Sequence, residues 1–234
     1  MTREEIRKEQ SQTVAIANEL IQKSRYELSK TEQKAVLYMV SKIKPFDEPG
    51  TEYTFSIKNF CRICNFNKDT GFYHQYLTDM LVNLKKQPLK IPLENGSKVI
   101  TSWFNDAVVS ETADEVKISF SKYLLPYLYE LQNRYTSFYL ENVLPMKSGY
   151  SIRLYEYIKS ESYRRREILL SLDELRQRAG CEEKYNQYSE LRINVLEPAK
   201  KDINMYSDLK IEYNAKKTGK KVSYIEFIIL PQDK

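Results

Sequence analysis

The segment from Leu170 to Ile229 constrains the fold of this 234-residue chain more than any other part of it. Its first part predicts a short helix, because Ser171 is a good N-cap, Glu174 stands at the capping-box position and Gly180 follows as a stop signal. Its second part predicts a longer helix with one buried face. The apolar residues of that face recur every four positions: Leu191, Val195, Ala199 and Ile203.

The rest of the segment predicts a β-hairpin with a basic tip. Residues 209–213 and 222–229 have the composition of strands, and the turn at 216–221 between them contains four lysines. Helix, turn, helix and basic hairpin, in this order, form the layout of a winged helix. In that layout the second helix enters a DNA major groove and the hairpin tip contacts phosphates.

Pro198 lies inside the predicted long helix. Proline removes one backbone hydrogen bond of a helix and its ring crowds the preceding turn. The sequence therefore predicts a kink or a break at this position.

An internal repeat sets the domain organisation. The pattern of residues 55–60 matches that of 170–175, and each copy continues as short helix, polar turn, longer helix and the tripeptide Leu-Lys-Ile, at 89–91 and 209–211. A hairpin ends each copy. Two copies of so long a unit predict two similar domains side by side rather than a solenoid. We therefore expect an α+β fold with two tandem winged-helix domains related by an internal repeat.

The expected boundaries place an N-terminal winged-helix domain at residues 1–121, a helical connector at 122–149 and a C-terminal winged-helix domain at 150–234. In the first domain, helical spacing of apolar residues predicts a short helix or ordered segment from Thr13 to Ile21. Further helices are expected after Ser29, whose capping-box partner is Glu32, and over 71–84. Strands are expected at 53–57, 89–93, 100–109 and 116–121.

Composition and motifs argue against an enzyme and against a cofactor. Cys61 and Cys64 have the spacing of zinc ligands, but no second ligand pair exists and His74 is the only histidine. The hairpin tip lacks the glycine spacing of a P-loop. The charged N-terminus and the lack of a long apolar run predict neither a signal peptide nor a membrane span, and three cysteines without framework spacing favour a cytoplasmic setting.

The candidate DNA contacts are polar and basic residues of the predicted second helix, of the stretch before it, of an arginine triplet and of the hairpin tip. In the C-terminal domain they are Arg164, Arg165, Lys184, Asn186, Gln187, Ser189, Arg192, Ile193, Asn194, Lys200, Lys201, Lys216, Lys217, Lys220 and Lys221. Auxiliary contacts are expected in the N-terminal domain from Lys68, His74, Gln75, Lys85 and Lys86.

Motifs over nearly the whole chain resemble the initiator Rep proteins of theta-replicating plasmids, the iteron-binding family with two winged-helix domains. They are residues 18–20 and 26–34 near the start, 152–157 at the opening of the second domain, 191–199 with 202–204 on the long helix, and 216–222 with 225–227 in the hairpin. They follow one another in the order of the family.

The resemblance implies that the second domain makes the main sequence-specific contacts to repeated origin elements. The first domain would add backbone contacts and form a dimer interface. Members of the family act as monomers at the origin and as dimers on their own promoter, and they recruit host initiation and helicase-loading proteins of the bacterial cytoplasm rather than catalyse a reaction.

The chain departs from the family after Arg192, where positions that are often basic in relatives are Ile193 and Asn194. On an ideal helical wheel Arg192 falls nearer the buried side. We therefore expect Asn194 to read a base, since Asn pairs bidentately with adenine, and Ile193 to contact a thymine methyl group.

Two other functions fit the same residues. One is a winged-helix transcriptional repressor with no role in initiation, and the other is a protein-interaction module, because a fold does not fix a function.

Overall fold

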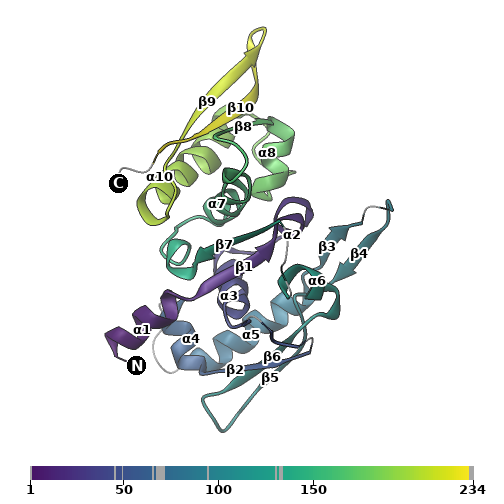
Figure 1. Cartoon of the computed structure of the whole chain (residues 1–234), viewed down its shortest axis with the longest axis vertical. Helices are drawn as coiled ribbons and strands as arrows, with labels where there is room; N and C mark the ends of the chain where they lie inside the picture. The colour runs from purple at the N-terminus through teal and green to yellow at the C-terminus, as the bar shows by residue number, and fades with distance from the viewer. Residues whose placement is uncertain are drawn as a thin grey trace. The chain divides into compact units, whose positions relative to one another are not determined.

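The computed structural model describes residues 2–44, 46–48, 50–64, 66, 72–93, 95–129, 131 and 134–231. It divides into two compact units, Met1–Leu144 and Pro145–Lys234. Each unit combines helices with antiparallel sheets (Figure 1), which confirms the expected α+β class. Among the described residues no helix is both long enough and apolar enough to cross a membrane.

The first unit contains eight helical segments within the described residues. They are α1 (Arg3–Gln10), α2 (Asn18–Lys23), α3 (Lys30–Val40), α4 (Ile57–Ile63), α5 (Tyr73–Lys86), α6 (Leu125–Leu128) and the 3₁₀ turns η1 (Lys122–Leu124) and η2 (Leu140–Asn142). The helix predicted after Ser29 is confirmed as α3, with Ser29 and Glu32 forming the reciprocal capping box. Helix α5 buries Leu77, Met80 and Leu84, the face that its sequence predicts.

The described residues of the first unit also form three antiparallel sheets. The largest has the order β2-β6-β5, with β2 (Glu52–Phe55), β6 (Val116–Phe120) and β5 (Phe104–Val109). The other two are pairs, β1 (Thr13–Ala17) with β7 (Tyr135–Tyr139) and β3 (Leu89–Pro92) with β4 (Lys98–Thr101).

The prediction of a helical connector at 122–149 was wrong. Residues 135–139 form strand β7, which pairs along its whole length with β1, so this part of the chain completes the first unit and the unit ends at Leu144. The segment 13–21, predicted as a short helix or an ordered segment, is ordered: it forms strand β1 and the start of helix α2. The helical alternative was wrong for residues 13–17. Val14 and Ile16 alternate into the core as in a strand, and short apolar runs do not separate strand from helix by periodicity.

The expected strand at 100–109 is in fact two strands of different sheets. Strand β4 ends before the buried Trp103, and strand β5 begins directly after it. The repeated tripeptide also has two fates: at 89–91 it lies in the separate β3–β4 hairpin, whereas at 209–211 it leads into the large hairpin of the second unit.

The second unit repeats the core pattern of the first. Its elements are α7 (Gly149–Ser162), β8 (Glu167–Ser171), α8 (Leu172–Ala179), α9 (Tyr188–Leu191), η3 (Arg192–Leu196), α10 (Glu197–Tyr206), β9 (Ile211–Thr218) and β10 (Lys221–Ile229). The sheet order β8-β10-β9 matches β2-β6-β5. In both units the middle strand of the sheet is the one that comes last in the sequence. The β9–β10 hairpin extends beyond the helices as a wing (Figure 1).

Helix α8 confirms the capping prediction in full. The Ser171 side chain accepts from the Glu174 amide, and the Glu174 carboxylate accepts from the Ser171 amide. Gly180 ends the helix with φ +74°, and a Cβ there would lie 3.3 Å from Cδ of Arg153. Both the left-handed backbone and the neighbouring side chain therefore favour glycine.

Pro198 does not break the long helix. The backbone stays helical through residues 188–206, and the irregularity is a π-helical turn, η3, directly before the proline. The Glu197 amide donates to the carbonyl of Arg192, five residues earlier. The wider turn accommodates the ring, and it shifts the helical phase of the residues that precede it.

Candidate nucleic-acid interface

The recognition helix, which we define as residues 188–206, packs one face into the second unit and presents the other. Its buried residues include Leu191, Val195, Ala199 and Ile203, as their spacing predicts. Asp202 is also buried and accepts hydrogen bonds from the amides of Lys147 (2.8 Å) and Ser148 (3.1 Å), which fixes the helix against the start of α7. The exposed face carries Arg192, Ile193, Asn194, Glu197 and Lys201.

Arg176 of α8 holds the loop that precedes the recognition helix. Its guanidinium donates to the carbonyls of Tyr185 (3.3 and 3.1 Å) and Asn186 (3.1 Å), and it pairs with Asp173 at 3.0 Å. Arg176 was not among the predicted site residues, because an arginine on an amphipathic helix gives no sign that it will bond to a loop. The contact positions Asn186 and Gln187 at the helix N-terminus, where the Gln187 backbone amide donates to the Glu190 carboxylate at 3.4 Å.

Asn194 is oriented by the helix itself. Its Nδ2 donates to the carbonyl of Glu190 at 2.9 Å. An amide nitrogen has two hydrogens, so one N–H and Oδ1 stay available, which is the donor and acceptor pair that reads adenine. Ile193 beside it is 59% exposed, so its apolar side chain is available for contact with a partner.

Arg192 is exposed, so the ideal wheel that placed it nearer the buried side was wrong. The wider η3 turn accounts for the difference in phase. The guanidinium lies 3.2 Å from the carboxylate of Glu197. The same carboxylate accepts from the hydroxyl of Tyr213 on β9 at 2.7 Å, and burial together with this hydrogen bond raises the pKa of Tyr213 above its ordinary value.

The two lysines of α10 have different surroundings. Lys200 pairs with Glu212 of β9 at 2.5 Å and is partly buried, whereas Lys201 is exposed. No described residue pairs with the Lys201 ammonium. Asn204 bonds to the backbone of Ile211 through both its amide atoms and so serves the fold.

The wing tip is a two-residue turn, Gly219-Lys220, between β9 and β10. The first of the two residues, Gly219, has φ +64°, the pattern of a type II′ hairpin turn, which favours glycine there. Lys216 is drawn back to Glu226 of β10 at 2.9 Å. Lys217, Lys220 and Lys221 are exposed and have no partner among the described residues, so the tip offers three uncommitted cations.

The arginine triplet is not near the wing tip. Its last residue precedes β8, whose first residue, Glu167, lies opposite Ile228 at the far end of β10 from the tip. Arg165 pairs with Glu161 at 2.5 Å, and Arg164 is exposed without a described partner. The arginine triplet and the wing tip therefore lie at opposite ends of strand β10 and do not form one basic surface.

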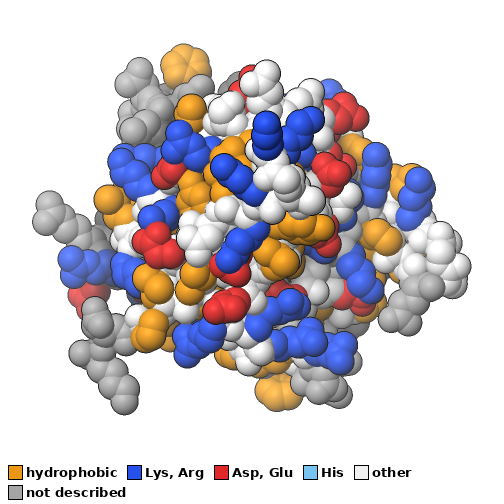
Figure 2. All heavy atoms as spheres, turned by 90° about the horizontal axis from the view of Figure 1, so that it is seen from above, with side chains coloured by type: hydrophobic (Ala, Val, Ile, Leu, Met, Phe, Trp, Pro, Cys, Tyr) orange, Lys and Arg blue, Asp and Glu red, His pale blue; other side chains and the backbone are white. Residues whose placement is uncertain are grey.

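Figure 2 shows basic side chains spread over the visible face with acidic ones among them. Of the ten cationic candidates in the second unit, four pair with carboxylates: Arg165, Arg192, Lys200 and Lys216. The other six have no partner among the described residues: Arg164, Lys184, Lys201, Lys217, Lys220 and Lys221. Of these six, Lys201 lies on the recognition helix, and Lys217, Lys220 and Lys221 lie at the wing tip. The helix and the wing tip therefore each have cations without a described partner.

The auxiliary candidates of the first unit are not brought together. His74 and Gln75 lie in the first turn of α5, and Lys85 and Lys86 lie in its last turn. Eleven residues of helix separate them by about 16 Å. His74 is engaged with the carbonyl of Ser110 at 2.5 Å, and Lys85 donates to the carbonyl of Phe104 at 3.3 Å. Lys68 lies outside the described residues.

The hairpin turn of the first unit, residues 110–115 between β5 and β6, has the opposite charge from the wing tip of the second. It contains Glu111, Asp114 and Glu115. Asp114 accepts from the Ser56 hydroxyl (2.6 Å) and the Lys58 amide (2.9 Å), so it caps α4 and ties the turn back to the unit. Carboxylates repel phosphates, so this turn is unsuited to contacts with a phosphate backbone. No sequence prediction covered this contrast, although the acidic residues are visible in the sequence.

The cysteines are buried and free. Burial raises the pKa of Cys61 to about 12 and that of Cys181 to about 11, so their thiols stay protonated and unreactive. Within the described residues no group of three or more His, Cys, Asp or Glu side chains is placed to hold a metal ion.

Comparison with known proteins relates both units to replication initiators. The family model described as "Initiator Replication protein, WH1" matches residues 13–159, and the one described as "Initiator Rep protein, WH2" matches residues 171–229. A replication initiation protein of Escherichia coli is 28% identical over 203 residues, which are 83% of this chain. The chain spans only 63% of the length of that relative.

Two solved structures share the fold. The Pi initiator protein, crystallised in complex with iteron DNA, is similar with a TM-score of 0.73 and 18% identity, over 96% of this chain and 99% of that one. Domains 2 and 3 of RctB are similar with a TM-score of 0.52 and 14% identity, over 88% of this chain and 84% of that one.

Proposed function

Because this chain belongs to the family of initiator replication proteins with WH1 and WH2 domains, we propose that it binds repeated origin elements of a plasmid as duplex DNA and initiates replication there. It acts by binding and recruitment and catalyses no reaction itself. The observation that carries the proposal is the recognition helix of the second unit, which presents Asn194 in a fixed orientation beside the exposed Ile193.

The second unit divides the work between its helix and its wing. The helix lies in the major groove, where Asn194 reads an adenine and Ile193 packs on a thymine methyl group. Lys201 and the wing lysines Lys217, Lys220 and Lys221 contact phosphates, which position the protein without reading sequence. The similarity to the Pi initiator, whose structure holds iteron DNA, supports this assignment.

The first unit adds fewer DNA contacts and has other partners. Lys85 and Lys86 at the end of α5 are its cations for a phosphate backbone, while its acidic hairpin turn stays off the DNA. We assign to this unit the dimer that represses the promoter of the protein itself. Host initiation and helicase-loading proteins are the further partners of the chain.

The first test is a mobility-shift assay with the DNA upstream of the gene, competed with random duplex at physiological salt. Preferential binding that gives a ladder, as successive repeats fill, is the expected result. Binding without preference would contradict sequence-specific recognition of that DNA. No binding would contradict the proposal and favour a protein-interaction module.

A plasmid-maintenance assay separates an initiator from a simple repressor. The gene supplied in trans is expected to support replication of a plasmid that carries the bound repeats. Promoter repression without replication would leave the chain a transcriptional repressor. The Asn194→Ala variant serves as the control, because it should weaken both activities together if both depend on the same recognition helix.

A further inference from the structure

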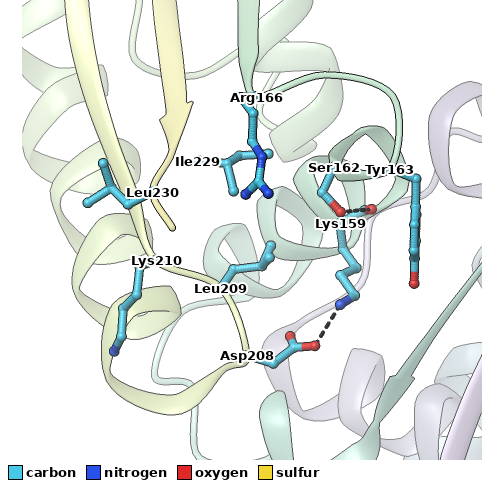
Figure 3. A pocket seen from close by; sticks show the side chains of 9 residues that line it. All are labelled: Lys159, Ser162, Tyr163, Arg166, Asp208, Leu209, Lys210, Ile229 and Leu230. Atoms are coloured by element: carbon cyan, nitrogen blue, oxygen red, sulfur yellow. Dashed lines mark hydrogen bonds and ion pairs between the residues drawn. The ribbon is translucent and has the colours of Figure 1, made fainter. Parts of the chain in front are cut away.

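A cavity of about 320 Å³ lies at the base of the wing, at the opposite end of the hairpin from the wing tip (Figure 3). Its walls come from the end of α7, the loop before β8, the loop before β9 and the end of β10. The residues that the argument uses are Lys159, Tyr163, Arg166, Asp208, Leu209 and Ile229. A cavity of this size accommodates a few side chains of a ligand.

The cavity attracts anions. Three cationic side chains line it, those of Lys159, Arg166 and Lys210, against one carboxylate, that of Asp208. The two carboxylate oxygens of Asp208 are already engaged, one by the Tyr155 hydroxyl at 2.8 Å and the other by the Lys159 ammonium at 2.6 Å. Asp208 therefore does not neutralise the remaining cations.

Arg166 is the available cation. Its backbone is fixed, because its carbonyl accepts from the Ile229 amide at 2.8 Å. Figure 3 shows the guanidinium pointing into the cavity between Ile229 and Leu209, and no described residue makes a hydrogen bond or ion pair with it. A guanidinium held this way offers a planar fork of N–H donors that fits a carboxylate bidentately.

The floor of the cavity is apolar. Leu209 and Ile229 are almost fully buried beneath it, while Leu230 at 36% and Tyr163 at 71% exposure form apolar edges. A phosphodiester backbone has no apolar group to pack on such a floor. A peptide that carries an apolar side chain between acidic ones can pack on the floor and pair with the cations. Arginine and tyrosine around an apolar centre are also the composition typical of protein-binding hot spots.

The cavity faces a different end of the second unit from the wing tip. Ile211 pairs with Ile229 at the base of the hairpin, and Thr218 pairs with Lys221 at the tip. Seven residues of strand separate these two pairs, or about 23 Å. DNA held by the helix N-terminus and the wing tip therefore leaves the base free for another partner.

We propose that this cavity is a docking site for an acidic peptide segment of a partner protein, with a carboxylate on Arg166 and an apolar side chain on Leu209 and Ile229. The site is independent of the proposed DNA-binding function, because it uses none of the same residues. It gives the initiator a second surface that can be occupied while DNA is bound.

The test is fluorescence anisotropy of the full chain with a fluorescein-labelled octapeptide, Asp-Asp-Glu-Leu-Phe-Glu-Asp-Asp, at physiological salt. Two charge reversals are compared, Arg166→Glu in the cavity and Lys217→Glu at the wing tip. Both residues are exposed and without described partners, so both variants are expected to fold, and they change the net charge equally. Arg166→Ala provides a milder variant at the same position.

We expect Arg166→Glu to weaken peptide binding at least tenfold and DNA binding less than twofold, and Lys217→Glu to do the reverse. A peptide with Ser in place of Leu and Phe should bind at least fivefold more weakly to the unmodified chain. Three results would overturn the proposal: no peptide binding, equal losses in the two variants, or loss of DNA binding in Arg166→Glu, which would assign the cavity to phosphates. Peptide binding by a chain that ignores DNA would instead contradict the proposed function alone.

Discussion

The Tyr213 hydroxyl on the wing strand donates a 2.7 Å hydrogen bond to the Glu197 carboxylate on the recognition helix. The same carboxylate pairs with Arg192, so one acidic residue couples the wing to the helix and neutralises the helix's first basic side chain. A carboxylate in the middle of a surface for a polyanion limits affinity. It also determines which side chains are available to read bases.

Glu197→Gln should strengthen DNA binding severalfold, because it removes a negative charge and releases Arg192 to a phosphate. The slope of log K against log salt should steepen by about 0.9, the value for one added phosphate contact. Titration of a labelled repeat at several salt concentrations measures both quantities. Glu183→Gln, an equal change in the exposed loop before the helix, is the control and should have little effect. Weaker binding with lost preference at one C·G pair would mean instead that Glu197 reads a cytosine amine.

Asn194→Ala should reduce the preference for the specific repeat over random duplex at one A·T position, by about 1–3 kcal/mol. The reason is the fixed amide, whose free N–H and oxygen match the edge of adenine. Footprinting and competition with single-base variants of the repeat measure the loss. Met205→Ala, at an exposed position of the same helix that is not among the candidate contacts, is the comparison and should leave both the preference and the non-specific affinity unchanged. An Asn194→Ala footprint identical to that of the unmodified chain would remove Asn194 from the readout.

Lys201→Ala should flatten the salt slope by about 0.9, whereas Lys200→Ala should change it less. The difference arises because Lys200 is already paired with Glu212, while Lys201 is uncommitted among the described residues. The double variant should weaken binding to all sequences about equally. Salt titrations of the three variants test the pair directly. An unchanged slope in the double variant would mean that α10 does not dock on DNA.

Glu156 should make folding stability depend on pH. It is buried in α7, and burial, partly opposed by Arg153, raises the pKa of its carboxyl to about 7. The folded chain therefore keeps a proton that the unfolded chain releases, and stability falls as pH rises from about 4.5 to about 7. Glu156→Gln, which stays neutral, should raise the melting temperature at pH 8 and change it little at pH 5.

Thermal melts of the full chain at several pH values measure this difference. Glu174 supplies a control of opposite sign, because the Ser171 amide and hydroxyl lower the pKa of its carboxyl and its contribution is lost on acidification. A Glu156→Gln benefit that is the same at pH 5 and pH 8 would show that the carboxyl does not titrate in this range.

Local signals sufficed for the helices with strong caps and clear spacing. Ser171, Glu174 and Gly180 define α8 through contacts within a few residues, and Leu191, Val195, Ala199 and Ile203 define the buried face of the recognition helix. The segment 13–17 had no such signal. Its strand conformation depends on pairing with residues 135–139, more than a hundred positions away, and no local pattern encodes that partner.

The sequence by itself determined the two winged-helix units and the identity of the basic and polar residues, because caps, helical periodicity and turn composition act over short distances. Only the tertiary structure decided which of those residues are available. Three of the cations pair with carboxylates from another helical turn or another strand: Arg192 with Glu197, Lys200 with Glu212 and Lys216 with Glu226. The π-helical turn before Pro198 turned Arg192 outward, and the base of the wing gathered Arg166 and Leu209 around a cavity. Ion pairs and cavities join residues that are distant in the chain, so folding alone brings them into contact.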